Sequence, residues 1–178
     1  MFKSLQQGRL LKHPLHGLVV HVPIGLWAAS VFFDILFFST RNPNFATTSY
    51  YCVMVGLLGA IIAIPTGAIE YFYLPRTKQL RRLGLNHLAL NAFVTAFFAV
   101  SFVLRKNAEG GSLTNVSIPA FVMSALGFIL LSISGYLGGR MVYEYRAGAH
   151  PEARDPDQPL PSEEEEIVQR EARSDRAA

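Results

Sequence analysis

Four apolar stretches, each about as long as a membrane-spanning helix, constrain the fold of this chain more than any other feature. A helix rising 1.5 Å per residue needs about 20 apolar residues to cross the roughly 30 Å hydrocarbon core of a bilayer. Strands in lipid must close into a barrel, and these stretches lack the alternation of barrel strands. The sequence therefore predicts an all-α integral membrane protein with four spans, at about 17–38, 50–74, 85–104 and 118–142.

The composition and the short links agree with that class. Hydrophobic residues make up 51% of the chain and charged residues 16%, and the mean hydropathy is +0.27. Soluble domains of this length are rarely so apolar. Short polar links make neighbouring spans antiparallel, so we expect an up-down-up-down four-helix bundle.

Lysine and arginine are distributed unevenly around the predicted spans. One side of the membrane has only Arg41, Arg105 and Lys106. By the positive-inside rule the other side is cytoplasmic, which predicts a multi-pass protein of the inner membrane with both termini in the cytoplasm. The basic residues on that side are Lys3, Arg9, Lys12, Arg76, Lys78, Arg81, Arg82, Arg140 and Arg146.

The composition changes at residue 147. We expect residues 1–146 to form the transmembrane domain and residues 147–178 to form an acidic, proline-rich cytoplasmic tail. The tail has too little apolar surface to offset the entropy of ordering, so it should be disordered. The expected partner is the lipid bilayer, because no nucleic-acid motif accompanies the basic residues.

Each predicted span carries a stripe of small or polar residues along one helical face. Membrane helices associate through such residues, so most of these positions should be helix contacts. The glycine faces would also serve as interfaces in a homo-oligomer or an accessory subunit. The stripes comprise Gly17, His21, Gly25 and Ala28; Gly56, Gly59, Ala63, Gly67 and Glu70; His87, Asn91 and Thr95; and Ser124, Gly127, Ser134 and Gly138.

Three ionisable residues from different spans fall at a similar depth. Glu70 lies 20 residues beyond Tyr50, or about 30 Å along the helix, which places it near the cytoplasmic boundary. His21 is just over one turn into the first span, and His87 is one to two turns past Arg82. Ionisable groups at membrane depth usually face a partner, a cavity or a ligand. We therefore expect His21, Glu70 and His87 to form a candidate site.

The run from His13 to Asp34, HPLHGLVVHVPIGLWAASVFFD, resembles the opening signature of a bacterial membrane family, domain of unknown function 2231. The likeness continues in the glycine-rich second span ending at Glu70, in His87 with Asn91, and in the closing GYLGGRMVYEY. It extends to about residue 146. The resemblance implies four spans, and some members are joined to Rieske-type or cytochrome modules, which favours redox work by association.

The sequence departs from that family pattern at two positions. Val22 stands where Phe is common, and Tyr145 stands where a His-Gly pair often follows. The second departure weakens any ligand proposed at the end of the fourth span. Tyr143, in the same closing segment, is retained as a further candidate site residue.

The leading hypothesis is a redox-linked membrane component that binds one b-type haem, with His21 and His87 as axial ligands and a redox protein as partner. Glu70 and Asn91 would orient the imidazoles. Alternatively, His21, Glu70 and His87 form a two-His-one-carboxylate metal site. A third reading is a non-enzymatic scaffold or accessory subunit, with a structural His/Glu/Asn hydrogen-bond network.

Asp34 supports a further alternative. It lies about 20 Å above His21, where it could snorkel, pair with Arg41, or start an ion or proton relay to Glu70 in a transporter. Cys52 is the only cysteine, which excludes thiolate metal cages. No hydrolase, kinase or transferase motif is present, so enzymatic activity is left open.

Overall fold

The computed structural model describes residues 9–10, 13–74, 77–106, 113–145, 147 and 167. The acidic tail expected over 147–178 lies outside the described residues, apart from Ala147 and Ile167. In chain order the elements are β1 (Arg9–Leu10), β2 (His13–Pro14), α2 (Leu15–Val19), α3 (His21–Thr40), α4 (Pro43–Phe72), α5 (Lys78–Lys106) and α6 (Ile118–Tyr143).

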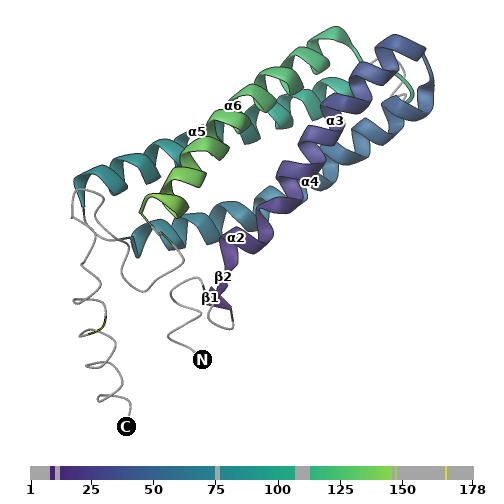
Figure 1. Ribbon diagram of the computed structural model, residues 1–178. Helices are drawn as coiled ribbons and strands as arrows, with labels where there is room; N and C mark the ends of the chain where they lie inside the picture. Colours follow the sequence, from purple (N-terminus) through teal and green to yellow (C-terminus); the bar gives the residue numbers. More distant parts are fainter. Residues whose placement is uncertain are drawn as a thin grey trace.

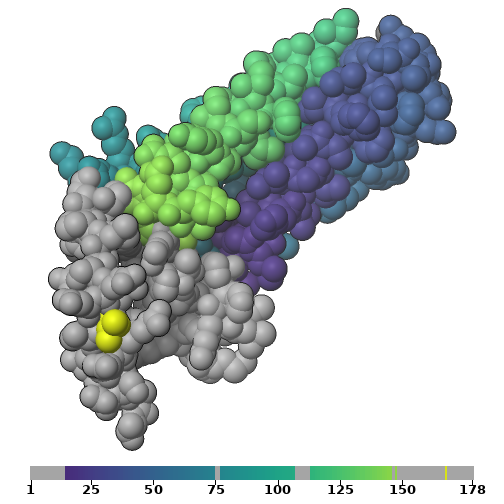
Figure 2. All heavy atoms as spheres, in the orientation of Figure 1, coloured from purple at the N-terminus to yellow at the C-terminus, as the bar shows by residue number. Residues whose placement is uncertain are grey.

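The long helices form an antiparallel bundle built from two pairs, α3 with α4 and α5 with α6 (Figure 1). Four segments are long and apolar enough to cross a membrane, so the predicted all-α membrane bundle is confirmed. The two-residue strands β1 and β2 pair antiparallel before the first span. Figure 2 shows α6 and α3 side by side along one face of the elongated molecule. The spans are Leu15–Thr40, Pro43–Phe72, Lys78–Lys106 and Ile118–Tyr143.

The first link is much shorter than the sequence suggests, because α4 begins at Pro43 rather than near Tyr50. The Asn42 side chain caps this helix by accepting the Asn44 N–H at 3.0 Å. Pro43 suits the first helical turn, because an N–H at this position would have no partner within the helix. Arg41 ends α3 in the left-handed region with φ 58°, which lets the chain reverse within two residues.

The first span is divided at Val20 into α2 and α3, although helical bonds run across this residue from the Val20 N–H to His16 O and from the Ile24 N–H to Val20 O. Pro23 has no N–H, so the carbonyl of Val19 lacks the helical partner it would otherwise have. A missing bond of this kind is a common cause of helix kinks. On the cavity side of this position, α2 packs against α4. The position of His16 depends on this geometry.

The centre of the bundle is held by close packing around Trp27. Its indole stacks on Phe98 with ring centroids 4.5 Å apart, which joins α3 to α5. A Cβ at Gly56 would lie 2.4 Å from the Trp27 side chain, and one at Gly127 would lie 2.9 Å from Phe98. These glycines therefore let neighbouring helices approach closely, as their stripes predict.

Candidate functional site

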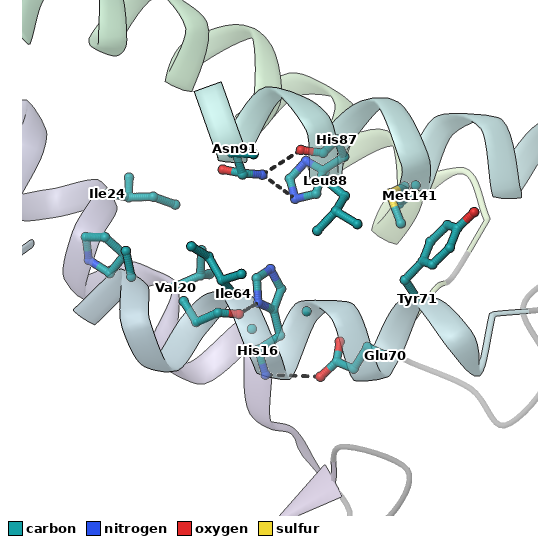
Figure 3. A pocket seen from close by; sticks show the side chains of 18 of the residues that line it. His16, Val20, Ile24, Ile64, Glu70, Tyr71, His87, Leu88, Asn91 and Met141 are labelled. Atoms are coloured by element: carbon teal, nitrogen blue, oxygen red, sulfur yellow. Dashed lines mark hydrogen bonds between the residues drawn. The ribbon is translucent and has the colours of Figure 1, made fainter. Parts of the chain in front are cut away.

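A cavity of about 400 Å³ lies between the two helix pairs, near the end where α4 finishes and α5 begins. We call this end of the bundle the cavity end. Its walls are mainly apolar, and its polar groups converge from α2, α4 and α5 (Figure 3). The lining includes His16, Gly67, Glu70, His87, Asn91 and Gly138.

His16 enters the cavity from α2 and is held on both its backbone and its side chain by α4. Its backbone N–H donates to Glu70 Oε1 at 3.0 Å, and its ring Nδ1 lies 2.9 Å from the carbonyl oxygen of Ala63. A Cβ at Gly67 would lie 2.8 Å from the imidazole. Glycine at this position therefore makes room for the ring.

His87 enters from α5 and is held in the same manner by α6. Its Nδ1 lies 2.9 Å from the carbonyl oxygen of Ser134. The Asn91 amide is 3.1 Å from His87 Nε2 and also donates to Ser134 Oγ at 2.8 Å. A Cβ at Gly138 would lie 3.0 Å from the ring. Each imidazole is thus bonded within its own helix pair and has a glycine beside it.

These bonds fix the tautomers of the two imidazoles. A carbonyl oxygen can only accept a hydrogen bond, so each Nδ1 carries the proton and each Nε2 of a neutral ring is an acceptor. The rings face each other across the cavity, with centroids 6.4 Å apart and planes at 88° (Figure 3). The two helix pairs therefore each contribute one histidine with an acceptor Nε2 to the lining of the same, mainly apolar cavity.

The sequence predicted His21 as the partner of His87, but the structure places His16 there instead. His21 is the first residue of α3, is exposed, and is not among the residues lining the cavity. The predicted span began at Gly17, which left His16 outside it. Pro14 directly before α2 is the signal that could have moved the helix start, since proline suits a helix N-terminus.

Two further site predictions change with the structure. The predicted metal group of His21, Glu70 and His87 does not form, and no cluster of three potential ligands is found within the described part of the chain. Tyr143 ends α6 with 87% of its surface exposed and does not line the cavity. Its exposure suits an aromatic residue at the membrane interface.

Asp34 lies in the other half of the bundle and pairs with Arg105 rather than with Arg41. Arg105 Nη1 donates to Asp34 Oδ1 at 2.9 Å, and Nη2 donates to the other oxygen. Both side chains are buried, at 0% and 2% exposure. The pairing arises because α5 continues past the predicted end of the third span, whereas Arg41 lies over the ring of Phe38. Since both carboxylate oxygens are used, nothing in this contact supports a relay from Asp34 to Glu70.

Serine hydroxyls complete the surroundings of this ion pair. Arg105 also donates to Ser49, to Ser101 and to Ser124, which come from α4, α5 and α6. With Asp34 from α3, the group joins all four long helices. We call these five residues the clasp. Removing one partner of a buried ion pair typically costs about 3–5 kcal/mol, because the other charge is left unpaired.

Comparison with known protein families gives a match. The family model described as "Predicted membrane protein (DUF2231)" matches residues 12–151. No curated protein and no solved structure matches the chain. The matched range contains all four spans, the cavity and the clasp.

Proposed function

The chain belongs to the DUF2231 family of predicted membrane proteins, and on that premise we propose that it is a redox-linked membrane component that binds one b-type haem between His16 and His87. Imidazole is a common axial ligand of haem iron, and helix bundles place such ligands on facing helices. Bound haem would supply one-electron chemistry. The cavity residues would hold it and keep it from water.

One observation carries the proposal: both imidazoles line the same cavity, and their Nδ1 bonds to carbonyl oxygens leave Nε2 as the unprotonated nitrogen of each neutral ring. Imidazoles that bind metals usually donate their other N–H to a carbonyl or carboxylate, which fixes the ring and raises its basicity. Here the carbonyls of Ala63 and Ser134 accept those bonds. This arrangement is in place without any ligand.

The ring separation is compatible with a shared metal ion. Bonds of about 2.0 Å from one metal to two imidazole nitrogens hold those nitrogens about 4 Å apart. Rings whose centroids are 6.4 Å apart can reach that separation when both nitrogens point inward. The apolar walls, which include Trp27, Ile64 and Leu131, suit the faces and edges of a porphyrin.

Asn91 donates to His87 Nε2 in the ligand-free protein, and a haem held by this nitrogen would require Asn91 to release it. An amide NH₂ has two donors, and this one has acceptors in His87 Nε2, His87 O and Ser134 Oγ. Giving up the first contact leaves one acceptor for each donor. Asn91 can therefore release Nε2 without losing its place in the helix pair.

The location of the protein is part of the same proposal. Arg81, Arg82 and Arg140 lie at the cavity end, which supports a cytoplasmic position for that end in an inner membrane. Exposed aromatic residues gather there as well, as expected at a membrane interface. They are Phe72, Tyr73, Tyr136 and Tyr143. A redox protein that reaches haem from this side is the expected partner.

A second candidate function is a scaffold or accessory subunit without a cofactor. It is favoured by the complete set of bonds among His87, Asn91 and Ser134, which satisfies their polar groups in the absence of a ligand. Buried polar networks of this kind also specify how helices pair. In this case the two histidines would be structural.

Absorbance spectra of protein purified from haem-supplemented cells distinguish the two candidates. We expect a Soret band and a reduced α-band in the unaltered protein, and their loss in His16→Ala and in His87→Ala. His21→Ala is the matched control, because His21 is exposed outside the cavity, and it should keep the bands. A colourless protein that remains folded would favour the scaffold. Loss of the bands in His21→Ala alone would refute the assignment of His16.

A further inference from the structure

The face of α5 that lines the cavity continues toward the start of this helix as far as Arg81. The lining residues of α5 recur every three or four positions, at Gly84, His87, Leu88, Asn91, Ala92 and Thr95. Arg81 is three residues before Gly84 and seven before Leu88, so it lies on the same helical face. Six residues separate it from His87, which is about 9 Å along the helix. A guanidinium group therefore follows the cavity wall at the cavity end.

Tyr71 of α4, a residue of the cavity wall, holds the Arg81 side chain in this position. Arg81 Cζ lies over the Tyr71 ring, 5.3 Å from its centroid. The ring itself packs against α5, because a Cβ at Gly84 would lie 3.0 Å from it. Attraction to the face of an aromatic ring does not require any of the five N–H donors of a guanidinium. Arg81 is therefore placed beside the cavity with donors left for another group.

The carboxylates of the described residues do not pair with Arg81. Arg105 pairs with Asp34, and Arg140 pairs with Glu144, whereas Arg81 forms no ion pair within the described part of the chain. Glu70, the acidic residue of the cavity lining, is turned toward the His16 backbone, whose N–H it accepts (Figure 3). A half-buried arginine beside a mainly apolar cavity favours an occupant that carries an anionic group.

From this arrangement we infer that Arg81 binds a carboxylate of the molecule in the cavity and so determines which way round that molecule lies. The inference rests on the proposed function and deepens it, because haem carries two propionate carboxylates on one edge of an otherwise apolar ring. Guanidinium and carboxylate form two parallel hydrogen bonds, which fix orientation as well as adding affinity. The propionate edge therefore faces the cavity end. The apolar edge faces Trp27 and Leu131, which belong to the buried core.

Hemin and hemin dimethyl ester test this inference, because the ester keeps the iron and the ring but lacks both negative charges. Titrations followed by the Soret band give the dissociation constant of each compound. Arg81→Gln should bind hemin about tenfold more weakly, as expected when hydrogen bonds to a charged group are lost, and should bind the ester as the unaltered protein does. Arg82→Gln is the matched control, because Arg82 is exposed at the next position of the same helix, and it should bind both compounds normally.

A second variant keeps the test independent of folding defects in the first. Arg81→Lys retains the charge and should keep part of the preference for hemin over the ester. Equal affinities for the two compounds in the unaltered protein and in Arg81→Lys alike would overturn the role of Arg81, as would the same loss of hemin affinity in Arg82→Gln and Arg81→Gln. Either result would leave the haem site itself in place. Failure of the unaltered protein to bind either compound would overturn the inference together with the proposed function.

Discussion

At the scale of single residues, two glycines set the position of the candidate ligands. Gly67 faces the His16 ring and Gly138 faces the His87 ring, and in both cases a Cβ would lie within 3.0 Å of the imidazole. A methyl group at either glycine would therefore come too close to the neighbouring imidazole ring. The ring must move, and its Nδ1 bond to a backbone carbonyl is then strained or lost.

Gly67→Ala and Gly138→Ala should therefore lower haem occupancy while the bundle still forms. A lost hydrogen bond is worth about 1 kcal/mol, which corresponds to a roughly fivefold weaker affinity. Titration with hemin, followed by absorbance, measures the change. Gly25→Ala and Gly135→Ala are matched controls, because a Cβ at either position would meet nothing within 4 Å. Equal affinities in all four variants would show that the glycines do not position the rings.

The sequence predicted part of this site at the residue scale. His87, Asn91 and Glu70 were expected near one another, and the structure places all three in the wall of the cavity. His16 and Arg105 were missed for a common reason. Both lie at the ends of helices, where a shift of one turn decides whether a side chain is inside or outside the span. Hydropathy does not determine a boundary that closely.

At the scale of elements, Pro23 affects how the first span presents His16 to the cavity. Because Pro23 has no N–H, the carbonyl of Val19 lacks its helical partner, although the bonds on either side of it are made. In Pro23→Ala that bond could form and straighten the span, which would draw His16 away from Ala63 and Glu70. We expect reduced haem occupancy in this variant, measured by the same titration.

Pro119→Ala is the control for that prediction. Pro119 lies in the first turn of α6, where its N–H would have no helical partner in any case. This variant should bind hemin as the unaltered protein does. Normal binding by Pro23→Ala would indicate that the contacts of His16 with α4 are sufficient to place it without the kink.

The number and type of the helices could be predicted from sequence because lipid imposes a strict length on each apolar stretch. The sequence predicted that helices adjacent in the chain run antiparallel, but it did not predict which of them pack most closely. The cavity was not predictable, since its lining residues come from α2, α3, α4, α5 and α6. A cavity of this kind depends on contacts between helices, and the periodicity of one helix does not report them.

At the scale of the whole molecule, the orientation in the membrane decides which side has access to the cavity. In a cysteine-free background, Arg41→Cys should react with a membrane-impermeant maleimide added to intact spheroplasts. Gln79→Cys, an exposed position at the opposite end of the bundle, should react only after lysis. The reverse pattern would place the cavity end outside and contradict the positive-inside assignment.

The proposed ligation of one haem by both His16 and His87 is tested by electron paramagnetic resonance of the oxidised protein at low temperature. Since the Nδ1 bonds hold the ring planes at 88°, we predict a low-spin ferric signal of the strongly anisotropic kind that near-perpendicular axial imidazoles produce. A high-spin signal would mean that one histidine is not a ligand. A rhombic low-spin signal typical of parallel rings, or no haem signal from folded protein, would contradict the site described here.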